Sequence, residues 1–154
     1  MHFILVMLVK KMKIKKHSNC TCFNLRKATR VITQLFDEAL KPSGIRSTQF
    51  TLLSTVQSKG PIGIAELAKL LATDRTTLTR NLKPLLDRDL LKTISGSDAR
   101  RRPVALTPKG AETLRQAVPL WEAVQAEVTH KFGQPRWENM IRDLNLIVSQ
   151  IQEP

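Results

Sequence analysis

The sequence predicts a mainly α-helical fold that contains one small β-hairpin. Apolar residues recur every three or four positions over most of the 154 residues, which is the spacing of an amphipathic helix. Two short helical segments joined by a tight turn occupy residues 64–88. Two short β-like segments, separated by an arginine-rich loop, follow at residues 90–106. A chain of this length fits one domain with a proper core.

The first two helices are predicted from their apolar spacing and their stop signals. The first spans Leu25–Leu40 and is ended by Lys41–Gly44, since Pro and Gly stop helices. Ser47 is the expected N-cap of the second helix, which ends before the break at Lys59–Pro61. Four apolar residues of the second helix are expected in the core: Phe50, Leu52, Leu53 and Val56.

The next two helices are short and closely connected. The third spans Ile64–Leu71, and the fourth follows the tight connection at Ala72 and runs to about Arg88. Thr73 is its expected N-cap. Pro84 lies inside it, so we expect a kink or a tightened turn near residues 80–83. The expected core face of the fourth helix consists of Leu78, Leu82, Leu85 and Leu86.

The predicted hairpin leads into two longer helices. Its strands are Leu90–Ser95 and Pro103–Leu106, with a loop at residues 96–102. Thr107 caps the next helix, and Pro at its first position is tolerated because that N–H has no helical partner. Residues 133–135 separate this helix from the last one, whose apolar face includes Trp137, Met140, Ile141, Leu144, Ile147, Val148 and Ile151.

Charge is distributed unevenly along the chain. The formal net charge is +12, with net +8 in residues 1–30, net +5 in residues 74–110 and net −2 in residues 111–154. Such a balance favours a polyanionic partner, nucleic acid before an anionic membrane surface. The mildly acidic C-terminal segment is left for another role.

The fourth helix carries side chains that match the chemistry of a DNA groove. At about 100° per residue, Thr76, Arg80 and Lys83 lie farthest from its apolar face, and Arg75 and Thr77 flank them. Arginine bonds guanine with two hydrogen bonds, and threonine offers a hydroxyl and a methyl contact to thymine. The alternative is a solvated polar face. From this helix alone the two interpretations are evenly balanced.

The loop between the predicted strands favours the DNA interpretation. It contains Asp98, Arg100, Arg101 and Arg102. Arginines at a projecting tip enter narrow minor grooves, where the negative potential is enhanced. Asp98 can orient one of them through a bidentate pair. We therefore expect a helix-turn-helix with its second helix in the major groove and this hairpin as its wing.

The same residues resemble a known family. The run Gly96-Ser-Asp98-Ala-Arg100-Arg101-Arg102-Pro-Val104-Ala-Leu106-Thr107-Pro-Lys-Gly110, after a helix-turn-helix, is similar to the wing of the multiple-antibiotic-resistance regulator (MarR) family. The resemblance covers about residues 20–152. It implies a winged helix-turn-helix transcriptional regulator, usually a repressor. Such proteins bind pseudo-palindromic operators in double-stranded DNA as homodimers, and many are released by small phenolic ligands or oxidants.

The terminal helices carry more apolar residues than one small lobe can cover. A partner subunit would bury them, and a two-fold dimer also spaces two recognition helices for half-sites. We therefore predict a basic, flexible extension at residues 1–18 and a single domain at 19–152. Its DNA-binding lobe is 45–107, and 19–41 and 108–152 are dimerisation helices. The residues that need a partner are Trp121, Val124, Val128, Trp137, Ile141, Leu144, Val148 and Ile151.

Three interpretations of the two cysteines remain open. Cys22 and Cys20 can form a redox sensor, because Cys22-Phe-x-Leu25 resembles the reactive-cysteine segment of peroxide-sensing relatives. Those relatives hold the thiolate with tyrosines, and this chain has none. Alternatively, both cysteines and His17 offer three ligands to a metal. The third interpretation is that Cys22 is a small buried apolar residue and Cys20 is incidental.

The sequence argues against an enzyme. The sequence contains no metal-ligand pair on one helix face and no glycine-rich phosphate loop. We predict no cofactor, no resident metal, no membrane span and a cytoplasmic location. A small phenolic or other acidic ligand is expected between the dimer helices and the lobe, near Arg26, Arg30, Arg46 and Phe50. The alternative functions are non-specific nucleic-acid binding and a winged-helix module for protein contacts.

Overall fold

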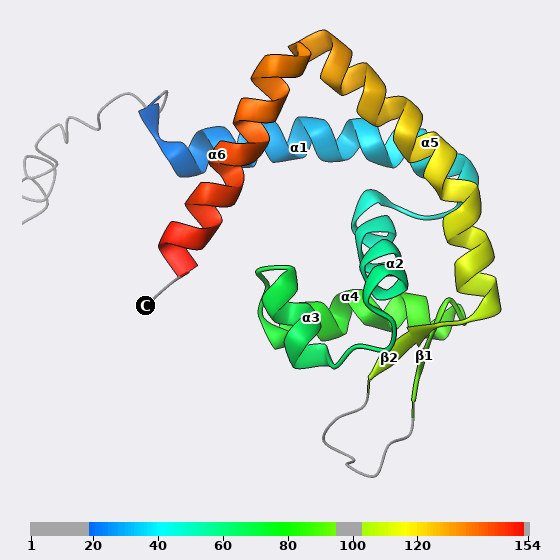
Figure 1. The fold of residues 1–154 in the computed structure, drawn as a ribbon. Coiled ribbons are helices and arrows are strands. Elements are labelled where there is room, and N and C mark those ends of the chain that lie inside the picture. Colours follow the sequence, from blue (N-terminus) through cyan, green and yellow to red (C-terminus); the bar gives the residue numbers. More distant parts are fainter. Residues whose placement is uncertain (1–18, 95–102, 153–154) are drawn as a thin grey trace, which may run out of the picture. The chain divides into compact units, whose positions relative to one another are not determined.

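The computed structural model describes residues 19–94 and 103–152 (Figure 1). It confirms the predicted class, a mainly helical chain with one antiparallel hairpin in a winged helix-turn-helix. The elements in chain order are α1 (Thr21–Leu40), the 3₁₀ turn η2 (Lys41–Ser43), α2 (Ser47–Lys59), α3 (Ile64–Leu70), α4 (Arg75–Asp87), β1 (Leu91–Thr93), β2 (Val104–Leu106), α5 (Pro108–Phe132) and α6 (Gln134–Gln152).

The described part of the chain divides into two compact units after Gln34. The first contains most of α1, and the second contains the end of α1 and all later elements. The predicted first helix is confirmed, although it begins at Thr21 rather than Leu25. Its buried residues, Phe36 and Leu40, lie in the last two turns, and Gly44 ends the following 3₁₀ turn in the left-handed region at φ 70°.

The core of the second unit lies among α2, α4, the hairpin and the first half of α5. The predicted core residues Leu53, Leu78, Leu82 and Leu85 are at most 1% exposed. Burial of each such side chain stabilises the fold by about 1.5–3 kcal/mol. Because α2 contacts α4, β2 and α5, it connects the lobe to the long helix. Other buried members are Leu40, Phe50, Val56, Leu67, Leu90, Leu91, Val104 and Ala117.

The start of α2 corrects one predicted N-cap. Arg46, not Ser47, is the N-cap residue. The reason is tertiary: Asp37 of α1 accepts hydrogen bonds from the backbone N–H of Ser47 (2.7 Å) and from its hydroxyl (2.6 Å). A carboxylate from the preceding helix therefore satisfies the first N–H of α2, and Ser47 becomes the first helical residue.

The hairpin is short and is connected to the α2–α3 loop. Its register pairs Leu91 with Leu106 and Thr93 with Val104, inside the ranges predicted for the two strands. Ile62 adds a bridge, because its N–H donates to Val104 O (3.0 Å) and its carbonyl accepts from Val104 N–H (2.9 Å). Val104, completely buried, is therefore held from both sides.

The start of α5 is bonded to the chain just after α4. Thr107 is its N-cap, as predicted, and accepts from Gly110 N–H (2.9 Å). The Thr107 hydroxyl donates to Asp89 O (2.6 Å), the Thr107 N–H donates to Leu90 O (3.2 Å), and the Lys109 ammonium donates to Arg88 O (2.8 Å). Three consecutive carbonyls after α4 thus accept donors from the first turn of α5.

The last two helices form an elbow at Gly133, where φ is 88°, as the predicted break required. α5 and α6 contact each other beyond it. Val124, predicted to need a partner subunit, is 4% exposed within this chain, so that expectation is wrong for Val124. No helix among the described residues is long and apolar enough to span a membrane.

Candidate nucleic-acid interface

A tight turn connects α3 to α4, the second helix of the helix-turn-helix. Ala72 adopts a left-handed conformation at φ 49°, which reverses the chain within a few residues. The N-cap of α4 is Asp74, not the predicted Thr73. Asp74 has extended backbone angles and a carboxylate that reaches the first turn, whereas Thr73 precedes it by one residue. Thr and Asp are both common N-cap residues, so the sequence does not distinguish Thr73 from Asp74. The backbone angles of Asp74 identify it as the N-cap.

The α4 helix has one buried and one exposed face, as its sequence predicts. Leu78, Leu82 and Leu85 are buried against the lobe. All five α4 residues predicted to contact DNA are exposed on the remaining surface: Arg75, Thr76, Thr77, Arg80 and Lys83. The guanidinium, hydroxyl and ammonium groups of α4 are therefore accessible to a ligand while the leucines of the same helix stay packed in the lobe.

One of these side chains also serves the helix itself. The Thr77 N–H donates to Asp74 Oδ1 (2.8 Å) and its hydroxyl donates to Asp74 Oδ2 (2.6 Å). These bonds lower the pKa of Asp74, the Thr77 hydroxyl bond most, because they favour the charged carboxylate. Because the Thr77 hydroxyl proton is donated to Asp74, the Thr77 side chain offers a ligand its methyl group and the lone pairs of its oxygen.

A second predicted contact residue is held at the other end of α4. The Lys83 ammonium lies 2.7 Å from Asp87 Oδ2, with side-chain exposures of 73% and 58%. Sequence reasoning did not single out Asp87. Its signal was the i, i+4 spacing of Lys and Asp on one helix.

Pro84 does not interrupt α4. The helix is α-helical throughout from Arg75 to Asp87 with Pro84 inside it, so the expected tightened turn is wrong, and the expected kink stays a prediction. Pro84 has no N–H to donate to the Arg80 carbonyl. The buried Leu82 and Leu85 hold the helix to the lobe on both sides of it.

The end of α4 is closed by paired hydrogen bonds. Leu90 N–H donates to Leu85 O (2.8 Å) and Asp89 N–H donates to Leu86 O (3.0 Å), with Asp89 in the left-handed conformation at φ 58°. This is the Schellman pattern of helix termini. Together with the bonds to α5, it fixes the direction of the C-terminal turn of α4.

The wing residues lie outside the described residues: Asp98, Arg100, Arg101 and Arg102. The base of the hairpin is described. Ile94 N–H donates to Pro103 O (2.8 Å), which extends the pairing of β1 and β2 to the ends of the loop. The two residues that flank 95–102 are therefore bonded to each other, and β1 contacts α4.

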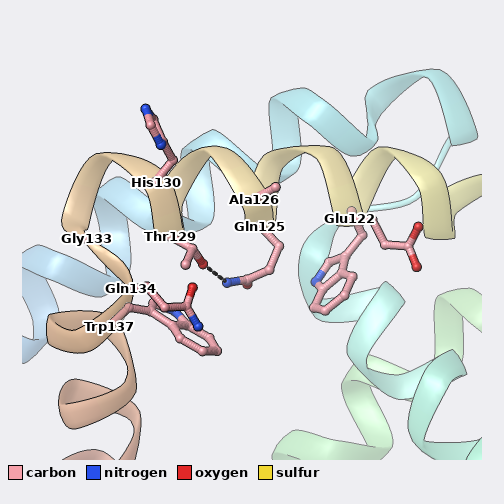
Figure 2. A pocket seen from close by; sticks show the side chains of 9 residues that line it. Glu122, Gln125, Ala126, Thr129, His130, Gly133, Gln134 and Trp137 are labelled. Carbon is pink, nitrogen blue, oxygen red and sulfur yellow. Dashed lines mark hydrogen bonds between the residues drawn. The ribbon is translucent and has the colours of Figure 1, made fainter.

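A cavity of about 670 Å³ lies in the elbow between α5 and α6. Two tryptophans, Trp121 and Trp137, line it together with carboxamide and hydroxyl groups. Figure 2 shows Gln125 bonded to Thr129 on its α5 side (3.1 Å) and Gln134 beside Trp137 on its α6 side, with His130 pointing away. Phe50 does not line it, because Phe50 is buried and stacks on Trp121 with ring centroids 5.5 Å apart.

Both cysteines are free and exposed. Cys22 lies in the first turn of α1, so the single chain does not bury it as the third interpretation expected. Among the residues that the structure describes, no three His, Cys, Asp or Glu side chains group as metal ligands, and His17 lies outside them.

Comparison with known proteins gives consistent matches. A model of the MarR family matches residues 45–101, which begin before α2 and include α2 to α4, β1 and most of the loop after it. The multiple antibiotic resistance protein MarR of Salmonella typhimurium is 36% identical over 84 residues, which are 54% of this chain and 58% of that protein. The chain spans about three fifths of the length of the curated relatives that it matches.

Solved structures match over a longer stretch. The M. tuberculosis transcriptional regulator MosR in complex with DNA has a TM-score of 0.77 and 39% identity, over 87% of this chain and 99% of that one. The repressor CouR bound to p-coumaroyl-CoA has a TM-score of 0.79 at 21% identity, over 90% and 98% of the two chains, which shows a shared fold. The chain belongs to the MarR family of transcriptional regulators.

Proposed function

We propose that this chain is a sequence-specific DNA-binding regulator, acting as a repressor in the cytoplasm. In this proposal it binds a pseudo-palindromic operator as a homodimer and is released by a small ligand or an oxidant. Residues 45–107 form the DNA-binding lobe, and residues 19–41 and 108–152 form the dimerisation helices. The observation that carries the proposal is the exposed polar face of α4, opposite three buried leucines and beside the hairpin.

Base reading is assigned to the exposed face of α4. Arg80 and Lys83 offer hydrogen-bond donors to guanine, and Thr76 and Thr77 offer hydroxyl and methyl groups. Arg75 flanks them in the first turn of α4. The wing residues Arg100, Arg101 and Arg102, with Asp98 orienting one of them, are assigned to the minor groove. The DNA-bound MosR relative supports DNA as the partner.

The homodimer proposal is supported by apolar side chains that this single chain leaves exposed. On the last turn of α5 and along α6 these are Phe132 (46%), Ile141 (37%), Leu146 (50%), Val148 (46%) and Ile151 (77%). Ile141, Val148 and Ile151 are spaced by seven and three residues and so share one face of α6, and an exposed apolar face of this kind marks a protein interface. Light scattering at micromolar concentration tests it: a mass of twice 17.4 kDa is expected, and a monomer contradicts it.

Release is assigned to one of two signals. The exposed thiols of Cys20 and Cys22 support an oxidant. The p-coumaroyl-CoA bound to CouR supports a small phenolic or other acidic ligand. The oxidant and the small ligand are distinguished by measuring operator binding of Cys22→Ser and of Cys20→Ser as peroxide is added. An unchanged oxidant response in both variants removes the thiols from the proposal and leaves the small ligand.

Selection of bound duplexes from random DNA tests the function as a whole. Enrichment of a two-fold symmetric motif supports a sequence-specific regulator. Binding without enrichment and with a steep salt dependence indicates the alternative, non-specific nucleic-acid binding. Failure to bind any duplex leaves the other alternative, a winged-helix module that contacts proteins.

Two substitutions test the division of roles between α4 and the wing. Arg80→Ala is expected to lower the discrimination between the enriched motif and random DNA by about 1–3 kcal/mol. Arg101→Ala is expected to weaken binding to both duplexes by similar factors, because it acts on the backbone and the groove shape. An equal loss on both duplexes for Arg80→Ala would contradict its assignment as a base reader.

A further inference from the structure

The C-terminal end of α4 holds a carboxylate that the base-reading proposal does not use. Asp87 is the last residue of the helix, and its Oδ2 lies 2.7 Å from the Lys83 ammonium. Lys83 is thus engaged by its own helix when no DNA is bound. The ion pair is exposed, at 73% for the lysine side chain and 58% for the aspartate, so DNA can reach the ammonium without any change in the core.

Asp87 is placed poorly for stabilising α4. A negative charge at the C-terminal end of a helix opposes the helix dipole, and lysine before the acid at i, i+4 is the less favourable order of such a pair. Asp74 at the other end is the opposite case. Its carboxylate accepts the Thr77 N–H and caps the helix, at the end where negative charge is favourable. Helix stability therefore accounts for Asp74 but not for Asp87.

The charge of Asp87 also opposes DNA binding. It adds a negative charge to a stretch, residues 74–110, whose net charge is +5, on the helix proposed to enter the groove. A phosphate or a guanine edge and the Asp87 carboxylate are all acceptors for the same ammonium protons. For Lys83 to bind DNA, it must exchange one acceptor for the other.

We propose that Asp87 is an affinity-determining residue that competes with DNA for Lys83. This inference rests on the proposed DNA-binding function and adds a residue that lowers the affinity. The carboxylate keeps Lys83 paired in the free protein, so part of the interaction of Lys83 with DNA is offset by the loss of that pair. An exposed i, i+4 pair of this kind changes an equilibrium by about twofold, which becomes about fourfold when two half-sites are occupied together.

A double-mutant cycle tests the competition directly. Asp87→Asn, Lys83→Gln and the double variant are titrated in full-length protein against two fluorescent duplexes of equal length. One carries the motif enriched from random DNA, and the other is random. Each titration is made at about 50 mM and about 200 mM salt. Glu66→Gln on α3 is the matched control, since it makes the same charge change at an exposed position of the lobe to which no DNA contact is assigned.

In the Lys83 background, Asp87→Asn is expected to tighten binding of the enriched duplex about two- to fourfold at low salt, and less at high salt because the pair is screened. In the Lys83→Gln background the effect should fall below half of that. Asp87→Glu, which keeps the charge within reach of Lys83, should bind like the parent protein. Urea unfolding of each variant verifies that the folded protein is being compared.

Three results overturn the proposal: no tightening by Asp87→Asn, the same tightening with and without Lys83, or equal tightening by Glu66→Gln. These results differ from a failure of the DNA-binding function itself. In that case the parent protein binds neither duplex. A parent protein that binds the enriched duplex but shows no coupling between residues 83 and 87 retains the function and loses this inference alone.

Discussion

Gly110 is the residue at which the structure makes its sharpest stability prediction. It is the third residue of α5, and its backbone N–H donates to the Thr107 hydroxyl. A Cβ built at this position would lie 1.9 Å from Leu90 O, 2.9 Å from Leu90 C and 2.8 Å from Leu106 Cδ2. The Leu106 side chain can rotate away, but the Leu90 contacts involve backbone.

The Leu90 carbonyl is held where it is. It accepts the Thr107 N–H (3.2 Å) and lies within 3.3 Å of the Thr107 hydroxyl, while Leu90 N–H is bonded to Leu85 O at the end of α4. Ordinary contact begins near 3.4 Å, so Gly110→Ala must separate the two backbones by about 1.5 Å, the difference from 1.9 Å. That movement breaks the junction between α4 and α5.

The expected cost follows from three opposing effects. Overpacking costs about 1–3 kcal/mol, and a buried N–H left without its acceptor costs about 1–3 kcal/mol more. The better helix propensity of alanine offsets about 1 kcal/mol. Gly110→Ala is therefore expected to lower the free energy of unfolding by about 3 kcal/mol, which for a chain of this size lowers the melting temperature by roughly 6–12 °C.

Urea unfolding followed by far-UV circular dichroism measures this difference, at one protomer concentration for all variants. Gly63→Ala is the control, because an added Cβ there meets nothing within 4 Å and φ is −68°. Its change should stay below about 1 kcal/mol, the usual size of a glycine-to-alanine effect. The reasoning is refuted if Gly110→Ala unfolds within about 0.5 kcal/mol of the parent protein, or if the two variants lose equal stability.

Substitutions at four further positions are predicted. Thr107→Val should destabilise by about 1–3 kcal/mol in urea unfolding, because Gly110 N–H and Asp89 O lose their hydroxyl partner; Thr107→Ser should recover most of the loss. Leu53→Ala, at a completely buried position, should cost about 2–5 kcal/mol. Ala72→Gly should raise the melting temperature slightly, since left-handed angles cost alanine about 1 kcal/mol. The folded-state pKa of Asp74 is lowered from 3.8, so its stabilisation is present above pH 3.8 and disappears as the pH falls through the folded-state pKa. Acid titrations followed by circular dichroism should show a smaller loss for Asp74→Asn, and identical curves would refute this.

Several features could be predicted because they depend on neighbours in sequence. The spacing of Leu78, Leu82 and Leu85 identified the buried face of α4, and the opposite face then followed from helix geometry. Thr107 before Pro108 marked the start of α5, since a cap needs only the next three residues. The wing motif and the uneven charge distribution depend on the sequence alone, and both indicated DNA as the partner.

Other features could not be read from neighbours. Ser47 is a good N-cap by type, yet the acceptor of its N–H is Asp37, which belongs to the preceding helix. Thr73 and Asp74 are both capping residues, and only the backbone conformation selects Asp74. The helix α4 continues through Pro84, and the buried Leu82 and Leu85 on both sides of it pack against the lobe. Cys22 was expected by one interpretation to be buried, and it is exposed.

By itself, the sequence determined which segments are helical, which face of each is apolar, and where basic and hydroxyl groups gather. These properties repeat every few residues and depend on local geometry and solvation. Only the tertiary structure decided that Leu90 O leaves no room for a side chain at Gly110, and that Asp37 holds Ser47. It likewise decided that the first turn of α5 is bonded to the chain after α4. Such contacts join residues 10 to 21 positions apart, and their distances depend on how whole helices pack, which no local pattern records.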